Sequence, residues 1–404
     1  MPIGEARLHY HYPNAAPAPV ELWLAQPPEC SSQTDVQVTR SSQEPAGTVE
    51  VAGNLVTHYR IPPFRALTLE WTFLQQRVEL REDAPGAGTC LTAGERSLYL
   101  ADSPQIPRHP AIEAEAHRLA GGASSPFEAA RLFFHALTTG YSYAWPVLDR
   151  GALQMLRTRR GDCGQFSSLF VALCRVIGIP ARPLVGSLRT PWVDSGHVWA
   201  EFWIDGAGWI PADPSRGQAC EAMRRRGVMD AEPDRFFGQL GAGYFVFSIG
   251  FDLPLGEHYG PPVRPLTLLA RLGKRVSFAG RPLRWGFETL AGNLPYLQPA
   301  YPRCYSGRGL QALFRCPQLG HWAVEPRQLR WMTFQDVLEQ TLVPFLGIVL
   351  GIGLLLDSRV PGIALGAAAF TFLTVASSVG LKMWLRGTGF AKRLSAKRGK
   401  PPGQ

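Results

Sequence analysis

Charged side chains are scarce in this chain. They make up 18% of its 404 residues, against roughly 25% in an ordinary globular domain. The shortage indicates that part of the chain is not built to face water. Apolar residues reach 46%, which is enough for hydrophobic cores and excludes a wholly disordered protein. The length favours two or three domains.

Cysteine is sparse as well. The seven cysteines are too few for a disulfide framework in so long a chain, and no two of them form a CxxC pair, so a structural zinc site is not expected. The first residues lack the basic start and the apolar core of a signal peptide. The part that faces water is therefore expected where thiols stay reduced, with no metal or other cofactor.

Positive charge is concentrated near the C-terminus. The segment 382–404 holds seven Lys and Arg residues and no acid, which accounts for most of the net charge of +9. Elsewhere no basic patch is interleaved with aromatic residues. Nucleic acid is therefore not expected as a partner.

Residues 1–105 favour an all-β, sandwich-like domain. Segments such as 20–24 and 67–73 alternate apolar and polar residues, and clusters of Pro, Gly, Ser and Asn separate them at a spacing typical of a sandwich. His9 and His11 share one face of the first strand. No third ligand lies nearby, so the spacing favours a solvated strand over a metal site.

Helices take over from about residue 112. Ser125 and Pro126 precede an amphipathic run and supply the capping serine and first-turn proline typical of a helix start. A second helix is expected from Cys163 to Ile177. Strands are expected near 182–188, 197–204, 208–211 and 244–251. Helices followed by strands predict an α+β domain at 106–255.

The last third of the chain divides into three parts. Residues 256–337 are rich in Pro and Arg with weak periodicity, so they receive no assignment. Residues 342–356 and 360–381 are uncharged runs of 15 and 22 residues, and the second would span roughly 33 Å as a helix, enough for a bilayer core of about 30 Å. The pattern favours a transmembrane helical hairpin at 338–382 with a basic tail at 383–404 over buried core helices.

Charge placement predicts the orientation of this hairpin. Arg327 and Arg330 precede the first run and the basic tail follows the second, so the positive-inside rule keeps both flanks in the cytoplasm. The remaining domains would then lie on the cytoplasmic face of the membrane. A single span through 360–381 is the alternative, and it would place them on the side opposite the tail.

Cys163 stands where a helix N-terminus is expected. Asp162 can cap that helix, and the positive end of its dipole lowers the pKa of a thiol, which favours the nucleophilic thiolate. Cys174 lies about three turns further along the same helix and is expected in the core. Taken alone, Cys163 is also compatible with a small buried hydrophobe.

Two further residues complete a candidate site. His197 opens a strand whose alternate residues are apolar, and from there it can take a proton from the thiol. Asp213 ends the next strand and can accept a hydrogen bond from the second imidazole nitrogen, which fixes the orientation of the ring. Taken alone, His197 is compatible with an ordinary surface histidine, and Asp213 followed by Pro214 is more often a turn at the end of a strand.

Together these segments resemble the transglutaminase-like superfamily in its bacterial branch. The matching stretches are 160–165, 197–202 and 208–214, and the resemblance covers about 110–255. It implies a papain-like fold, with Cys163 as nucleophile, His197 as general base and then acid, and Asp213 as the residue that orients it. The N-terminal β region is similar to the β domain that often precedes this core.

The resemblance implies a thiol enzyme of the cysteine protease type. It would form a thioester with an amide of a protein or peptide substrate and then pass the acyl group to water, which we favour, or to an amine. The Cys163 N–H is one expected oxyanion donor, and Tyr143 and Trp145 are alternatives for the second. A catalytically silent, membrane-anchored binding or assembly module is the competing hypothesis. The sequence leaves the substrate and the oligomeric state open.

Overall fold

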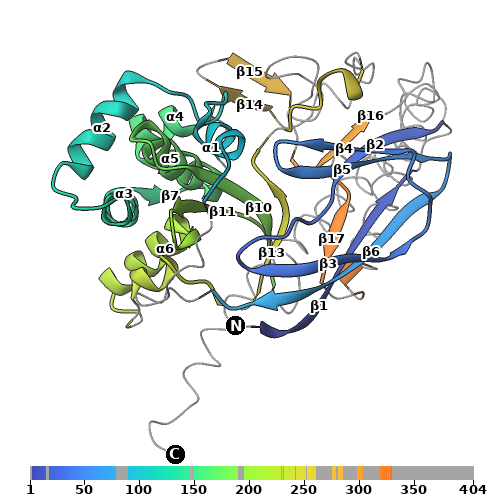
Figure 1. Ribbon diagram of the computed structural model, residues 1–404, viewed down its shortest axis with the longest axis horizontal. Coiled ribbons are helices and arrows are strands. Elements are labelled where there is room, and N and C mark those ends of the chain that lie inside the picture. The colour runs from blue at the N-terminus through green and yellow to red at the C-terminus, as the bar shows by residue number, and fades with distance from the viewer. Residues whose placement is uncertain are drawn as a thin grey trace, which may run out of the picture.

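Two packed bodies, one of helices on a sheet and one of two sheets, make up the protein in a computed structural model (Figure 1). The structure describes residues 2–14, 18–78, 90–145, 147, 149–189, 195–228, 230, 232–241, 243–251, 253–260, 275–278, 281–284, 298–303, 319–324, 326 and 328–329.

The N-terminal body consists of two four-stranded sheets packed face to face. Alternation of apolar residues along the strands places large side chains such as Tyr10, Trp71 and Leu22 between the sheets, where they are buried. The predicted β-rich N-terminal region is therefore confirmed. The first sheet has the order β17 (His321–Ala323), β1 (Pro2–Pro13), β6 (Ala66–Gln76), β3 (Gln33–Ser41), and the second β16 (Ala300–Arg303), β2 (Val20–Ala25), β5 (Asn54–Ile61), β4 (Gly47–Val51).

Two of these strands come from far along the chain. β16 and β17 lie in the segment 256–337, to which the sequence pattern assigns no structure, and each adds an antiparallel edge strand to one sheet. β17 pairs Ala323 with His9, and β6 places Glu70 opposite the same histidine. His9 is therefore 9% exposed, with Nδ1 3.4 Å from a Glu70 carboxylate oxygen. The prediction of a solvated face at His9 is wrong, because these distant neighbours cover it.

The second body carries an antiparallel sheet covered by helices. The sheet order is β12 (Gly208–Ala212), β11 (Ser195–Ile204), β10 (Ala181–Leu188), β13 (Tyr244–Ile249). Its helices are α1 (Ala93–Leu100), α2 (Pro110–Ala120), α3 (Pro126–Gly140), α4 (Ala152–Thr158), α5 (Cys163–Val176) and α6 (Pro214–Arg225). The mixed helix-and-sheet core is thus confirmed. The short elements are β7 (Ser142–Tyr143), β8 (Asp149–Arg150), β9 (Arg160–Gly161), η1 (Pro233–Phe236), η2 (Gly256–His258), β14 (Arg275–Phe278) and β15 (Arg281–Arg284).

Helix α5 is the centre of this body. It begins at Cys163, as the sequence predicts, because Asp162 and Gln165 form a reciprocal capping box, which is typically worth about 1 kcal/mol. It ends before Gly178, whose φ of +86° breaks the helical geometry. Its residues are buried on nearly all sides, and it packs on the face of β11 that presents Val198, Ala200 and Phe202.

Strand β13 belongs to the cores of both bodies. Phe245 and Phe247 point into the β sandwich. Tyr244 and Val246 instead pack with Trp199 in the second body, and an irregularity in the pairing with β10 places Ile249 in the same cluster. Because the side chains of residues 244–247 point alternately to opposite faces, this one strand joins the two hydrophobic cores.

In the part of the chain that the structure describes, no helix is both long enough and apolar enough to cross a membrane. The predicted hairpin at 338–382 and the basic tail at 383–404 lie outside the described residues.

Candidate active site

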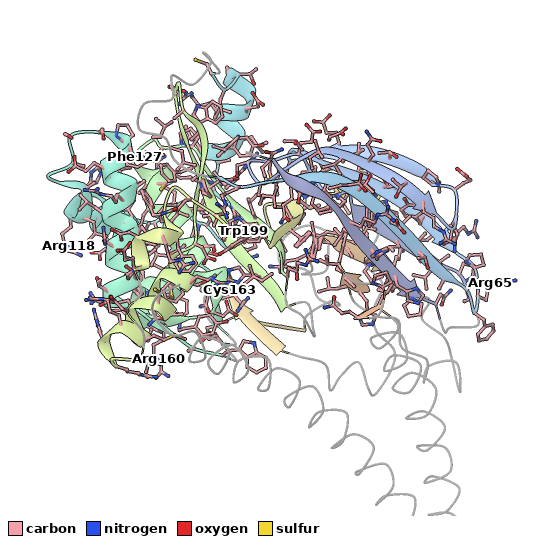
Figure 2. All side chains as sticks on the ribbon, turned by 90° about the horizontal axis from the view of Figure 1, so that it is seen from below. Arg65, Arg118, Phe127, Arg160, Cys163 and Trp199 are labelled. Carbon is pink, nitrogen blue, oxygen red and sulfur yellow. The ribbon has the colours of Figure 1, made fainter. Side chains whose placement is uncertain are left out.

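The thiol of Cys163 lies at the first position of α5 and is partly exposed. Figure 2 shows it on the side of the molecule that holds the helices, where it packs against the hydrophobic core around α5. Asp162, directly before it, caps the helix and forms an ion pair with Arg150. The capping geometry therefore holds Cys163 at the positive end of the dipole of a buried helix.

His197 lies next to Asp213 and next to the thiol. Its Nε2 is 2.7 Å from Oδ2 of Asp213, which leaves Nδ1 to face Cys163. Burial lowers the pKa of His197, but the charge of Asp213, the hydrogen bond with that carboxylate and a further hydrogen bond with Cys163 raise it to about 10. The imidazole is therefore held in its charged form beside the sulfur, the arrangement that supports a thiolate–imidazolium pair.

Asp213 is fully buried and accepts four hydrogen bonds. Oδ2 accepts from His197 and from the hydroxyl of Tyr244 at 2.9 Å. Oδ1 accepts from the hydroxyl of Ser215 at 2.9 Å and from the backbone N–H of Arg216 at 3.0 Å, which makes Asp213 the N-cap of α6. Burial raises the pKa of the carboxyl, yet His197 and Arg216 lower it overall. The group is an anion that both orients the histidine and starts a helix.

Sequence reasoning did not identify Tyr244 as part of this site. The alternating run at its position predicts a strand, and β13 begins there. No local pattern, however, links a tyrosine to a carboxylate 31 residues earlier in the chain.

The two oxyanion candidates differ in where they lie. β7 pairs in parallel with β9 and places Tyr143 opposite Gly161, two residues before Cys163. Burial of the phenol and the charge and hydrogen bond of Cys163 raise the pKa of Tyr143, so the hydroxyl stays protonated as a donor. Tyr143 is 46% exposed and Trp145, two residues further on, is 65% exposed. The hydrogen bond of Tyr143 with Cys163 places the phenol hydroxyl beside the thiol.

A buried ion pair lies on the same face of β11, four residues from His197. Glu201 is wholly buried and accepts from Nε and Nη2 of Arg182 at 3.0 and 2.8 Å. The guanidinium stacks over the Trp209 ring, with its Cζ 3.9 Å from the ring centroid. The other Glu201 oxygen accepts from the hydroxyl of Ser31 in the N-terminal body. This network was not predicted, and it fixes the two bodies together close to the candidate site.

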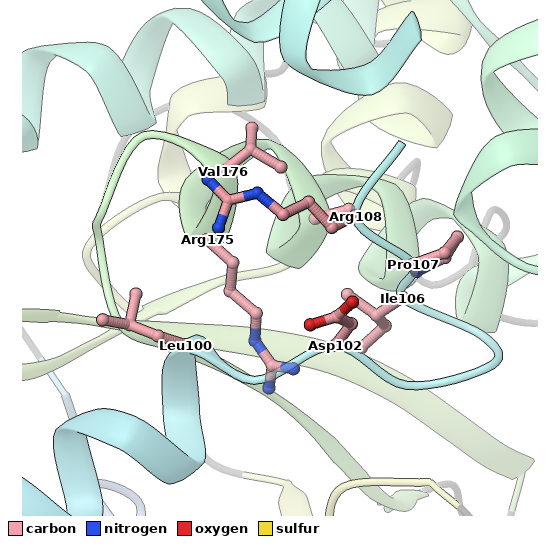
Figure 3. A pocket seen from close by; sticks show the side chains of 8 residues that line it. Leu100, Asp102, Ile106, Pro107, Arg108, Arg175 and Val176 are labelled. Carbon is pink, nitrogen blue, oxygen red and sulfur yellow. The ribbon is translucent and has the colours of Figure 1, made fainter. Parts of the chain in front are cut away.

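A shallow hollow at the opposite end of α5 is not part of this site (Figure 3). Arg175 lines it, roughly 18 Å along the helix from Cys163. Its guanidinium donates to the backbone carbonyls of Ala181 and Ala101. These bonds join the end of α5 to β10 and to the segment that follows α1.

A comparison with protein families finds a match in the second body. Residues 113–214 match the family model of the Transglutaminase-like superfamily. This segment carries a transglutaminase-like core. The chain is also 24% identical over 188 residues to an uncharacterized protein of Haemophilus influenzae, which covers 39% of this chain and 51% of the relative. The chain therefore spans about half the length of that relative.

A search of solved structures finds similarity to several proteins, among them the following three. One, from Cytophaga hutchinsonii and described as a candidate cysteine protease, is 16% identical with a TM-score of 0.40, covering 61% of this chain and 81% of that one. The periplasmic domain of TgpA from Pseudomonas aeruginosa is 17% identical with a TM-score of 0.35, covering 55% and 91%. Transglutaminase of red sea bream is 13% identical with a TM-score of 0.26, covering 51% and 46%.

Proposed function

We propose that the transglutaminase-like core is a thiol acyl-transfer enzyme acting on an amide of a protein or peptide. The observation that carries this proposal is the buried contact of His197 with Asp213, next to a thiol at a helix N-terminus. A histidine charged by a buried carboxylate stabilises the thiolate beside it. A structural role alone would not require a charged imidazole beside a half-exposed cysteine.

The reaction would proceed in two steps. The Cys163 thiolate attacks the amide carbonyl, the tetrahedral intermediate collapses to a thioester, and His197 donates its proton to the departing amine. His197 then takes a proton from water, the hydroxide attacks the thioester, and a carboxylic acid leaves as Cys163 is released. An amine in place of water would give a new amide. We favour water and treat the amine as the alternative acceptor.

We assign the oxyanion of the intermediate to two donors, the backbone N–H of Cys163 and the hydroxyl of Tyr143. A donor of this kind is typically worth about 3–4 kcal/mol in the transition state. The hydrogen bond of Tyr143 with Cys163 and the high pKa of its phenol support this choice over Trp145. Tyr143→Phe should therefore lower kcat by roughly 100-fold with little change in KM, whereas Trp145→Phe should not.

Labelling with iodoacetamide at pH 6 tests the proposal. A thiolate in an ion pair alkylates at this pH, whereas ordinary thiols stay protonated. Burial raises the pKa of Cys30 to about 11 and raises that of Cys174, so neither should react. Mass spectrometry should find the label on Cys163, and Cys163→Ala should remove it. A Cys163 that does not react at pH 6 would instead support a catalytically silent assembly module.

The acceptor is decided by incubating the protein with an unbiased peptide mixture, with and without added amine. Hydrolysis yields shortened or deamidated peptides in both samples. Transfer yields amine adducts only when amine is present. Cys163→Ala is the control, since it should yield neither.

We also propose that residues 338–382 anchor the protein as a helical hairpin with both flanks in the cytoplasm. The two uncharged runs and the basic tail support this topology. Protease added outside intact spheroplasts should leave residues 1–330 uncut. Digestion of that part from outside would show that a single span crosses and that the catalytic core faces the other side.

A further inference from the structure

Strand β13 lies at the edge of the catalytic sheet, and side chains of the N-terminal body cover that edge. Gln33 donates from Nε2 to the carbonyl of Val246 at 3.1 Å and accepts from the Val246 N–H at 3.0 Å. Asn54 makes the same two bonds with Ile249, at 2.8 and 2.7 Å. Each amide thus replaces the backbone of a missing neighbouring strand. Both side chains are almost wholly buried.

The same strand is fixed from a second side by the sandwich core. Phe247 stacks on Trp322 with ring centroids 4.2 Å apart, and Phe245 meets Phe73 edge-on at 5.7 Å. Packing of this kind leaves the strand little freedom to shift along or across the sheet. The position of β13 is therefore set by the N-terminal body as much as by its partner β10.

Tyr244, the first residue of β13, projects from this fixed strand to the catalytic carboxylate. Its hydroxyl donates to Oδ2 of Asp213, the oxygen that also contacts His197. Its ring lies edge-on to Trp199, with centroids 5.0 Å apart. Gln75 of β6, in the N-terminal body, donates to its backbone carbonyl at 3.4 Å. Burial raises the pKa of the phenol, so it remains a donor throughout the working range of an enzyme.

We propose that Tyr244 is a positioning residue for Asp213, and that the N-terminal β domain sets the orientation of the His197–Asp213 pair through β13. This inference rests on the proposed thiol chemistry. Ser215 and Arg216 hold Oδ1 from α6, whereas Tyr244 holds Oδ2 from β13, the strand of the catalytic sheet that the N-terminal body contacts. Without it the carboxylate can rotate about its Oδ1 contacts, and the imidazolium is held less firmly beside the thiolate. The N-terminal domain is then a part of the catalytic apparatus that touches no substrate.

Alkylation of Cys163 in the full chain by iodoacetamide at pH 6 and at pH 10 tests the role of Tyr244. Tyr244→Phe should lower the rate at pH 6 by about 5-fold, because fewer thiolates are stabilised. It should leave the rate at pH 10 unchanged, because there the thiolate forms without help. Tyr259→Phe is the matched control, since it removes another buried hydroxyl, which donates to the carbonyl of Pro302 at 3.1 Å and belongs to a hydrophobic cluster that contains no residue of β13. Equal loss in both variants, or none in Tyr244→Phe, would overturn the assignment.

The role of the N-terminal domain is tested by replacing the two side-chain amides that bond to β13. Gln33→Met keeps the length of the side chain but loses both bonds to Val246, and Asn54→Leu is a second variant should the first not fold. Each should lower the ratio of the pH 6 rate to the pH 10 rate in the same direction as Tyr244→Phe. When either amide variant is combined with Tyr244→Phe, the rate ratio should fall little further, because both substitutions act on Asp213 through β13.

Asn14→Leu is the control for these amide variants. Asn14 is another buried amide of the N-terminal body, but it donates to the carbonyls of Ala18, Ile61 and Pro62 and not to β13. It should cost stability and leave the rate ratio unchanged. If the Gln33 and Asn54 variants leave the rate ratio unchanged, as Asn14→Leu should, the proposed role of the N-terminal domain is overturned and that of Tyr244 still stands. If wild-type Cys163 reacts no faster at pH 6 than an ordinary thiol, the proposed function fails and this inference with it.

Discussion

Nε2 of His197 lies 2.7 Å from Oδ2 of Asp213, and the carboxylate of Asp213 is fully buried. A charge shielded from water acts strongly on a partner at this distance. The pair therefore behaves as one unit, in which the anion determines both the charge of the imidazole and which of its nitrogens faces Cys163.

The first prediction concerns the pH dependence of activity. The thiolate–imidazolium pair exists only while His197 is protonated, and its pKa is raised to about 10. The rate of acyl transfer from a peptide amide, in which His197 must donate a proton to the departing amine, should therefore hold its plateau through pH 8 and fall only as the pH approaches 10. In Asp213→Asn the alkaline fall should move to lower pH, because the charge that raises the histidine pKa is gone. An alkaline limb at the same pH in both proteins would contradict the assigned role of Asp213.

The same raised pKa predicts how stability changes with pH. A histidine whose pKa is higher in the folded protein stabilises it fully below its ordinary value of 6.5, and that contribution is lost as the pH rises towards 10. The free energy of unfolding, measured in urea, should therefore fall over this window with a slope of up to about 1.4 kcal/mol per pH unit from this group. His197→Gln should lack this component, so the difference between the two proteins should shrink from pH 6.5 to 10. A constant difference would count against a charged His197.

Substitutions of the two cysteines of α5 should separate an effect on catalysis from an effect on core packing. Cys163→Ala should abolish acyl transfer and leave the free energy of unfolding nearly unchanged, because the thiol is partly exposed at the end of α5. Cys174→Ala should retain activity and lose about 1 kcal/mol of stability, because Cys174 is fully buried in the core of that helix. Rates with p-nitrophenyl acetate and urea unfolding measure both. Equal loss of activity in the two variants would remove Cys163 as the nucleophile.

Substitutions of the three triad residues should not all reduce activity to the same extent. His197→Ala should reduce acyl transfer as far as Cys163→Ala, because neither the proton transfer nor the ion pair survives. Asp213→Asn should be milder, since an amide oxygen can still cap α6 and the ring keeps part of its orientation. Steady-state kinetics on the three variants, with folding checked by circular dichroism, give the comparison. Unchanged kinetics in Asp213→Asn would show that the carboxylate does not orient His197.

The buried Arg182–Glu201 pair predicts a stability effect of a different kind. Arg182→Met leaves the Glu201 carboxylate without its cation and should cost about 3–5 kcal/mol of unfolding free energy. The double variant Arg182→Met with Glu201→Gln should recover part of that loss, because the uncompensated charge is removed. Urea unfolding of the wild type, Arg182→Met, Glu201→Gln and the double variant measures the coupling. If the double variant is as unstable as the sum of its parts, the two side chains are not coupled.

Much of the candidate site was visible in the sequence because its signals are local. The capping box at Asp162 and Gln165 lies within four residues and fixes where α5 starts. Alternation along β11 and the turn at Asp205 and Gly206 fix where His197 and the antiparallel strand β12 lie. Such patterns depend on neighbours a few residues apart, so they can be interpreted without knowing the fold.

Contacts across long separations were decided only by the tertiary structure. Tyr244 reaches Asp213, Gln33 reaches Val246 over 213 residues, and Ser31 reaches Glu201 over 170. The edge strands β16 and β17 of the sandwich pair with β2 and β1, and the helices and main sheet of the second body lie between the paired strands in the sequence. None of these pairs has a periodic or spacing signal, because a long intervening chain can close at many points at nearly equal entropic cost. Local sequence patterns predict Cys163, His197 and Asp213 as the candidate site, whereas contacts between distant segments, such as that of Tyr244 with Asp213, arise only from the packing of the tertiary structure.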